Sequence, residues 1–312
     1  AAVKEVCKKN LIDVVHTHFL RENYISIFSR IAGNESALVN TQHMLTENNM
    51  ILRLFNRMFM LKDDKIIAVS CAVRDKMISE GIPSSKIEVI YNGVDVEYWE
   101  AGNRSMEFRK ELGISEDDFV ITSVARFSEE KGHVFLLEVI KYYKKLASSN
   151  ENIRKNVKFI LVGDGELFDR TRKLAGMLGV SDITVFTGYR SDLKKILLGS
   201  DLFLSHSKSE ALGISILEAL ACGLPVVATN AGGPAEIINN TTRCGILTNY
   251  GDAERFAAAI IRLITDERLY TAFKDNSVKL VRSKFNLDKT AHETYNLYKR
   301  CLELRKREGE NK

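Results

Sequence analysis

Residues 209–229 read SEALGISILEALACGLPVVAT and contain a polar loop, a short apolar helix and a strand. Gly223 provides the residue that ends the helix, and Pro225 prevents the helix from continuing. The stretch follows DLFLSHS, whose apolar run is typical of a buried parallel strand. Strand, loop, helix and strand in this order predict a βαβ unit, and therefore an α/β fold with a parallel sheet.

The same alternation continues along most of the 312 residues. Strands are expected in the segments IDVVHTH, SALVNTQ, KIIAVS, IEVIYN, FVITSVA, VKFILVG, ITVFTG, DLFLSHS, PVVAT and GILTN. Helices are expected over residues 132–147, 166–178, 190–199, 214–222, 234–239 and 252–265.

A charged stretch over residues 95–118 interrupts this rhythm and predicts a domain boundary, with this stretch as the linker. We expect a first Rossmann-like domain over residues 1–97 and a second over 98–289. The polar, amphipathic tail over 290–312 is expected to form a helix that crosses back and packs on the first domain.

The composition limits the classes of partner. The formal net charge is +4, which suits anionic small molecules or an acidic membrane surface and is too weak to indicate nucleic-acid binding. Five cysteines without a C-x-x-C pair indicate reduced thiols in a cytosolic protein and no zinc site. No apolar run reaches the ~20 residues of a membrane span, so we expect a cytoplasmic protein.

The opening stretch places two acids beside a helix N-terminus. Near Gly213 the first amides of the helix are free to bind an anion such as phosphate. Glu210 in the loop and Glu218 in the helix have carboxylates that can accept hydrogen bonds from sugar or ribose hydroxyls. The alternative is that one acid only stabilises the helix dipole and the other is solvated.

Two cations follow another strand, in the stretch SVARFSEEKGH. Arg126 and Lys131 would both lie at the carboxyl edge of the sheet, where fixed cations suit a diphosphate. The alternative is a surface ion pair with Glu129 or Glu130.

A glycine turn, LVGDGE, follows a further strand. It lacks the third glycine of a dinucleotide-binding fingerprint, which disfavours a dehydrogenase. We interpret Gly163 and Gly165 as residues that allow the backbone to turn beside a pocket.

The motifs ARFSEEKG, LVGDGE and FTGY, together with the E-x7-E block, resemble the retaining family 4 glycosyltransferases of the GT-B fold. DVVHTH, IIAVS and VIYNGVD resemble the N-terminal half of that family, and the resemblance runs from about residue 11 to residue 300. It implies two Rossmann-like domains whose parallel sheets face a cleft, with the acceptor on the first and the donor on the second.

The resemblance also implies an activity. A hexosyltransferase of this kind moves a sugar, with retention, from a UDP- or GDP-sugar to a glycan or lipid-linked acceptor in polysaccharide or glycolipid synthesis. It would need no cofactor and no metal, and the sequence has no D-x-D motif. Two rivals remain open: a non-catalytic scaffold that binds nucleotide-sugars, and a GT-B sugar-nucleotide epimerase.

The roles carry over residue by residue. Arg126 and Lys131 would hold the donor diphosphate, and Glu210 would bind hydroxyls of the donor sugar. Glu218 would bind the ribose. The remaining donor contacts implied are the backbone of Leu212, Gly213 and Ile214, the turn at Gly163, and Tyr189 and Arg190 beside the base.

On the acceptor side, His43 matches the family histidine near the reacting sugar. His16 and His18 follow a strand in the same half, and each either shapes the cleft or is structural. Two departures stand out. Nothing before residue 11 resembles the family's opening strand and glycine-rich loop, so we expect an incomplete first domain, and Ala211 replaces a common glycine.

Residues 48–61 contain basic side chains among Leu, Phe and Met. This composition favours a helix lying on an anionic bilayer, which would place the protein at the inner face of the membrane. The alternative is a core helix whose polar stripe, with Arg53 and Arg57, faces solvent.

Overall fold

A computed structural model describes residues 2–45, 49–100, 102, 104–150, 153 and 156–310. The chain divides into two compact units, each described by itself. Unit 1 contains residues 1–92 and 287–312, and unit 2 contains residues 93–286.

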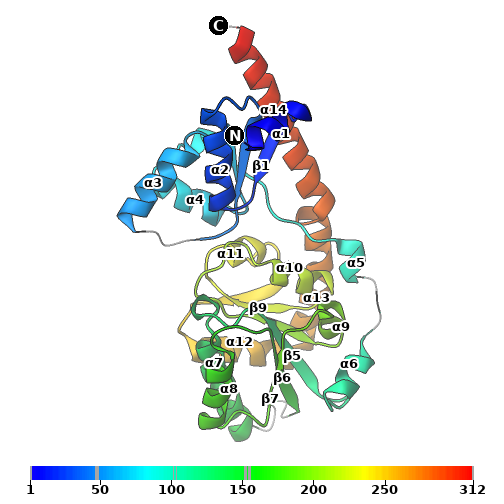
Figure 1. Cartoon of the computed structure of the whole chain (residues 1–312). Helices are drawn as coiled ribbons and strands as arrows, with labels where there is room; N and C mark the ends of the chain where they lie inside the picture. The colour runs from blue at the N-terminus through cyan, green and yellow to red at the C-terminus, as the bar shows by residue number, and fades with distance from the viewer. Residues whose placement is uncertain are drawn as a thin grey trace. The chain divides into compact units, whose positions relative to one another are not determined.

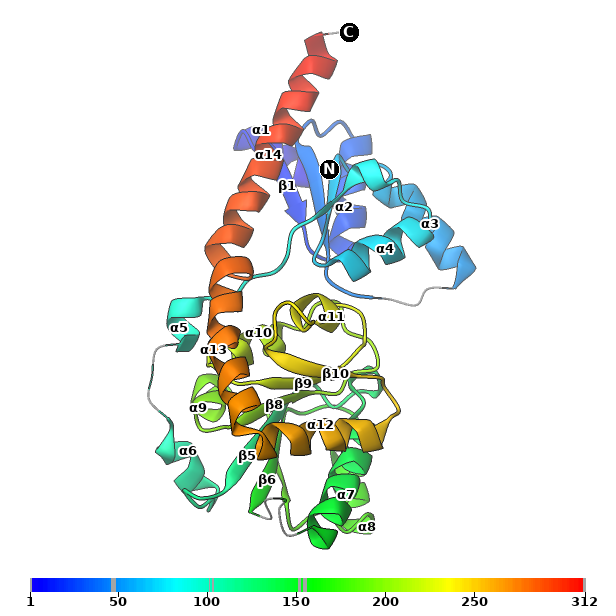
Figure 2. The ribbon, with the colours of Figure 1, turned by 180° about the vertical axis from the view of Figure 1, so that it is seen from behind.

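Unit 1 is built on a four-stranded parallel sheet. Its strands lie in the order β1 (Val14–Thr17), β2 (Ala37–Gln42), β3 (Lys65–Ala68) and β4 (Ile87–Val89). Helices α2 (Leu20–Ile31), α3 (Met50–Met60) and α4 (Cys71–Ser79) cover one face, and α14 (Leu287–Glu310) covers the other (Figures 1 and 2). Helix α1 (Ala2–Lys9) packs on α2, and a 3-10 turn, Ser84–Lys86, precedes β4.

Alternate residues of the strands pack on the two faces of this sheet. Val39 and Ile67 contact Leu297 and Cys301 of α14, so the tail helix packs on unit 1. Leu38, the neighbour of Val39, lies on the opposite face in a cluster with Ile27 of α2 and Phe59 of α3. This is the two-residue period that side chains follow along a strand.

Unit 2 is built on a six-stranded parallel sheet. Its strands lie in the order β10 (Gly245–Thr248), β9 (Val226–Thr229), β8 (Leu202–Ser205), β5 (Phe119–Val124), β6 (Val157–Val162) and β7 (Thr184–Gly188). The longer helices are α7 (His133–Ser149), α8 (Phe168–Met177), α10 (Ile214–Ala221), α12 (Ala253–Thr265) and α13 (Glu267–Lys284). The shorter ones are α5 (Val96–Glu100), α6 (Met106–Glu111), α9 (Leu193–Leu198), α11 (Pro234–Ile237) and a 3-10 turn, Glu129–Lys131.

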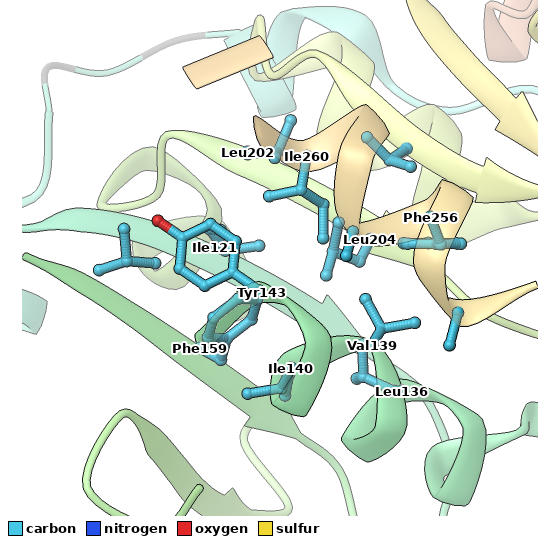
Figure 3. Packing of buried hydrophobic residues seen from close by; sticks show 14 of the residues in the cluster. Ile121, Leu136, Val139, Ile140, Tyr143, Phe159, Leu202, Leu204, Phe256 and Ile260 are labelled. Carbon is cyan, nitrogen blue, oxygen red and sulfur yellow. The ribbon is translucent and has the colours of Figure 1, made fainter. Parts of the chain in front are cut away.

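The main core of unit 2 lies between the sheet and the helices α7, α8 and α12. Figure 3 shows Tyr143 of α7 against Phe159 of β6, and Phe256 of α12 near Leu204 of β8. A second cluster on the opposite face joins Phe108 of α6 to Ile196 of α9 and to the strands β5 and β6. Burial on both faces explains why these strands appear as continuous apolar runs in the sequence.

The expected strands are confirmed, because each strand of the described residues falls inside one of the segments expected to contain it. The unit boundaries, however, lie at 92/93 and 286/287 rather than at 97/98 and 289/290. The stretch over 95–118 is not a solvated linker, because it contains α5 and α6 and belongs to unit 2. Val94 donates its backbone N–H to Phe285 O, which ties the start of this stretch to unit 2.

Candidate active site

The candidate site lies where β5, β6 and β8 end, because the loops that carry the predicted residues all leave the sheet at this carboxyl edge. Two glycines allow these loops to approach closely. A Cβ on Gly132, whose φ is +71°, would lie 2.4 Å from the His206 carbonyl oxygen. A Cβ on Gly163, whose φ is +134°, would lie 2.0 Å from the Ala125 carbonyl oxygen. Both contacts are shorter than van der Waals packing allows, so only glycine fits.

Lys131 and Glu210 are brought together at this edge. The Lys131 Nζ lies 2.6 Å from Glu210 Oε2, and Ser207 donates to the same oxygen at 3.3 Å. The Glu210 backbone is also fixed, because its N–H donates to Ala231 O and its carbonyl accepts from Gly233 N. A cation and a hydrogen-bond-accepting carboxylate therefore lie side by side, and their roles toward a phosphate and a sugar stay predictions.

Arg126 lies on the loop after β5 but is not part of this pair. Its Nη2 lies 3.2 Å from Glu166 Oε2, and both side chains are more than half exposed. The partner is thus neither Glu129 nor Glu130. An exposed pair of this kind contributes about 0–1 kcal/mol, so Arg126 can exchange its partner for a ligand anion at little cost.

Helix α10 supplies the second acid. Its N-cap, Gly213, has a φ of +103°. The Ile216 N–H already donates to Gly213 O, so the amides that precede the hydrogen bonds of the helix are those of Ile214 and Ser215. Glu218 lies on the second turn, and no side-chain hydrogen bond to its carboxyl occurs among the described residues. Burial raises the pKa of Glu218 to about 7. The Glu218 side chain is half-buried, so its carboxyl is available to accept a hydrogen bond from a ligand hydroxyl.

The two residues expected beside the base behave differently. Tyr189 is 78% exposed. Arg190 is engaged with two carboxylates, since its Nη2 lies 2.7 Å from Asp192 Oδ2 and 3.0 Å from Glu111 Oε2. Hydrogen bonds to Asp192 and then to Glu111 raise the pKa of Arg190. The structure therefore does not bring Arg190 to the Lys131–Glu210 pair, and its role beside a base stays a prediction.

Unit 1 contains a second candidate site, a cluster of three histidines at the carboxyl ends of β1 and β2. His18 Nδ1 lies 3.0 Å from His43 Nε2, and the His16 and His18 ring centroids are 4.3 Å apart. His16 Nδ1 lies 2.5 Å from the Tyr298 hydroxyl, and His16 Nε2 lies 2.6 Å from Thr41 Oγ1. A cavity of about 390 Å³ is lined by the three histidines and by residues of α14.

Two of these histidines, His16 and His43, are neutral near pH 7. Burial, followed by the charges of His18 and His43, lowers the pKa of His16 to about 4. Burial, followed by the charge of His18, also lowers the pKa of His43. Neutral imidazoles can both donate and accept hydrogen bonds, so the cavity suits hydroxyl groups better than a phosphate.

Sequence reasoning missed several residues of both sites. Ser207 and Gly233 hold Glu210, and the glycine pair at 232–233 was the only signal that pointed to a turn there. Tyr298 contacts His16 across 282 positions of sequence, and nothing local in the tail helix indicated that contact.

A larger cavity in unit 2, of about 620 Å³, contains none of the predicted residues. It lies at the amino end of β8, beside Asp201, and at the C-terminal end of α10, beside Cys222. Two of its cations are already paired, Arg104 with Asp201 and Arg282 with Glu100. We therefore place the chemistry at the opposite edge of the sheet.

Family models match both units. The model of Glycosyltransferase Family 4 matches residues 1–98, and the model of glycosyl transferases group 1 matches residues 105–280, which contain the Lys131–Glu210 pair. The chain belongs to the glycosyl transferases group 1 family. It is therefore a glycosyltransferase by family, with the GT-B fold that the motifs predicted.

Curated relatives share this family. The chain is 26% identical over 300 residues to the N-acetyl-alpha-D-glucosaminyl L-malate synthase of Bacillus anthracis, covering 94% of this chain and 76% of that one. It is 29% identical over 307 residues to the UDP-Gal:alpha-D-GlcNAc-diphosphoundecaprenol alpha-1,3-galactosyltransferase of Escherichia coli, covering 94% of this chain and 77% of that one.

Solved structures share the fold. HepE of Anabaena in complex with UDP has a TM-score of 0.84 at 22% identity, covering 95% of this chain and 80% of that one. A glycosyltransferase of Rickettsia africae has a TM-score of 0.83 at 25% identity, covering 96% of this chain and 80% of that one.

Two searches of the described residues bear on the remaining expectations. They contain no group of three or more His, Cys, Asp and Glu side chains that could hold a metal ion, and independence of a metal stays a prediction. None of the described helices is long and apolar enough to cross a bilayer.

Proposed function

We propose that this glycosyltransferase moves a sugar from a UDP- or GDP-sugar, with retention and without a metal, to a glycan or lipid-linked acceptor. The observation that carries the proposal is the Lys131–Glu210 pair at the carboxyl edge of β5 and β8, beside the N-terminus of α10. Relatives support it, since one is named for a UDP-sugar and an undecaprenol-linked acceptor.

The chemistry follows from charge. Breaking the bond between sugar and phosphate leaves negative charge on the departing diphosphate, and preorganised donors stabilise such charge best in the transition state. Lys131, Arg126 and the first amides of α10 would supply those donors. Glu210 would accept hydrogen bonds from the donor sugar. In this proposal Glu210 does not act as a nucleophile, and the departing phosphate helps to remove the acceptor proton on the same face.

The acceptor belongs at the histidine cavity of unit 1 in this proposal. Its lining includes the neutral imidazoles of His16 and His43, together with Thr41 and the Tyr298 hydroxyl, which offer hydrogen bonds to sugar hydroxyls. His43 lies at this cavity, where an incoming hydroxyl would meet it.

Titrating UDP, GDP and ADP against the full chain by calorimetry tests the proposed donor site. One of them should bind with a Kd at least about tenfold below the others, because a ribose and diphosphate site also contacts the base. The corresponding nucleotide-sugar, mixed with a lipid-linked or glycan acceptor, should then give a glycosylated product. NMR of that product should show the same anomeric configuration as in the donor sugar. Binding without any turnover would support the scaffold instead, and a changed donor sugar would support the epimerase.

The Glu218 carboxyl makes nucleotide binding pH-dependent. Hydrogen bonds from ribose hydroxyls favour its ionised form, so affinity should rise with pH up to about 7, where the half-buried carboxyl ionises. Calorimetry at about pH 6 and pH 8 should show tighter binding at the higher pH in the wild type. In Glu218→Gln this part of the pH dependence should vanish, and affinity at pH 8 should fall about tenfold.

Stability gives the control for this variant. A carboxyl whose pKa is raised on folding contributes stability that is present at low pH and lost as pH rises through about 7. Glu218→Gln should therefore raise the Tm at about pH 8 while it weakens nucleotide binding. If Glu218→Gln binds the nucleotide with unchanged affinity at both pH values, Glu218 does not bind the ribose.

A further inference from the structure

Helices α2 and α3 turn their apolar side chains outward. Many of the large hydrophobic side chains that are exposed among the described residues lie on these two helices: Ile25, Phe28, Ile31, Met50, Ile51, Leu52, Leu54, Phe55 and Met58. Met50 and Ile51 are each 81% exposed, and Leu54 is 66% exposed. We call these side chains the α2–α3 surface.

Several polar side chains of the same helices are buried, whereas Arg21, Glu22, Arg53 and Arg57 are exposed. Asn23, Ser26 and Ser29 of α2 are buried. Asn56 of α3 is also buried and accepts a hydrogen bond from the Tyr24 hydroxyl. A helix on the surface of a globular protein normally has the opposite arrangement. The alternative expected from the sequence, a core helix with its polar stripe toward solvent, holds only in part: Arg53 and Arg57 are exposed, but so are most apolar side chains of α3.

The exposed side chains form one continuous surface. The Phe55 and Phe59 rings are 4.7 Å apart, and the Phe28 and Phe59 rings are 5.5 Å apart, so aromatic contacts join the two helices. Both helices lie on the face of the sheet opposite α14 (Figures 1 and 2). A contiguous apolar surface of this kind indicates a partner.

The charges around the surface select the kind of partner. Helix α3 carries Arg53 and Arg57 and no acidic residue, and Lys62 follows it. The carboxylates nearby are Glu80, 3.8 Å from Arg53, and the exposed Glu22 of α2. An anionic bilayer attracts a helix face of this kind in two ways. The anionic headgroups attract the basic side chains, and the acyl chains bury the apolar ones.

We propose that the α2–α3 surface docks unit 1 on an anionic phospholipid bilayer. Helix α3 has 11 residues, about 16 Å in length, so it would lie in the plane of the interface. Of the residues 48–61 expected to touch a membrane, 49–61 are described and 48 lies outside the described residues. The proposal adds α2 and identifies the side that inserts.

A second copy of this chain is a weaker match for the same surface. A two-fold dimer would pair the surface with itself and bring the arginines of both copies close together at its border. The bilayer suits the proposed function, since a lipid-linked acceptor lies in a membrane, and the inference rests on that function only for this reason.

Sedimentation with lipid vesicles tests the proposal on the full chain. The protein should bind vesicles containing phosphatidylglycerol, bind vesicles of phosphatidylcholine alone about tenfold more weakly, and lose affinity as salt rises. The double variant Leu54→Gln/Met58→Gln should lose at least about tenfold of the binding. Met177→Gln/Leu304→Gln is the matched control, because it makes the same exchanges at exposed residues of α8 and α14, and it should bind like the wild type.

Separate measurements distinguish the possible failures. Nucleotide binding by calorimetry should be the same in wild type and both double variants, so loss of vesicle binding is not loss of the donor site. The proposal is overturned by equal vesicle binding in the two double variants, or by no binding to anionic vesicles. It is also overturned by light scattering that shows a dimer in the wild type and a monomer in Leu54→Gln/Met58→Gln.

Discussion

Replacing Lys131 with methionine should lower the rate of sugar transfer at least about 100-fold. The ammonium lies 2.6 Å from Glu210 Oε2, at the edge where the donor diphosphate would bind. Negative charge on that diphosphate increases as the sugar leaves, so the cation contributes more to the transition state than to the bound donor. We therefore expect kcat to fall much more than the affinity for the nucleoside diphosphate.

Two controls separate this effect from damage to the fold. Removing the cation leaves the Glu210 carboxylate, which is only 17% exposed, with a hydrogen bond from the Ser207 hydroxyl. This can lower stability by about 1–3 kcal/mol, so kcat is measured well below the Tm of each variant. Lys173→Met, at an exposed lysine of α8, should keep wild-type turnover. Transfer by Lys131→Met within twofold of that control would exclude Lys131 from stabilising the leaving group.

Lys131 and Glu210 could be predicted to lie at the same edge of the sheet because strand topology determines their position. Strands β5 and β8 pair directly in the parallel sheet, so the loops after them leave the same edge. The βαβ alternation was readable from apolar runs, and it places the loops after the strands at the carboxyl edge. The strand order that makes β5 and β8 neighbours came from the structure. From the same apolar runs, the strands of both units could be located in the sequence.

Contacts that depend on distant packing could not be predicted. The hydroxyl of Tyr298 reaches His16 only because α14 returns to the first sheet. The sequence of the helix does not show which of its residues makes that contact. The outward apolar faces of α2 and α3 are a similar case. A helical period shows that one face is apolar, but it does not show whether that face meets the core or another partner.

The charged stretch over 95–118 failed as a predicted linker because one of its charges is buried. Arg109 has a fully buried side chain. Its Nη2 lies 2.7 Å from Asp201 Oδ2, and its other nitrogens donate to the carbonyl oxygens of Gly199, Ser115 and Asp118. Burial lowers the pKa of Arg109, and the charge of Asp201 opposes that shift. A run of charges in a sequence cannot show which of them is enclosed.

Arg109→Met should therefore be the most destabilising of the substitutions considered. It leaves the Asp201 carboxylate with only the Val120 N–H and the half-exposed Arg104, and it removes the donor of three backbone carbonyls. Breaking a buried pair from one side costs about 3–5 kcal/mol. Trp99 is the single tryptophan and lies on α5 of unit 2, so its fluorescence in urea reports the unfolding of that unit. The transition should move to clearly lower urea, and binding of the nucleoside diphosphate should weaken with it.

Arg104→Met is the matched control, because Arg104 contacts the same aspartate at 2.8 Å but has a side chain that is 49% exposed. Water can replace an exposed partner, so this variant should lose less than about 1 kcal/mol. Equal shifts in the two variants would mean that burial does not determine the strength of the Arg109 contact. A larger loss for Arg109→Met alone would establish that the stretch after residue 93 is held in unit 2 by an enclosed cation, although its sequence resembles a linker.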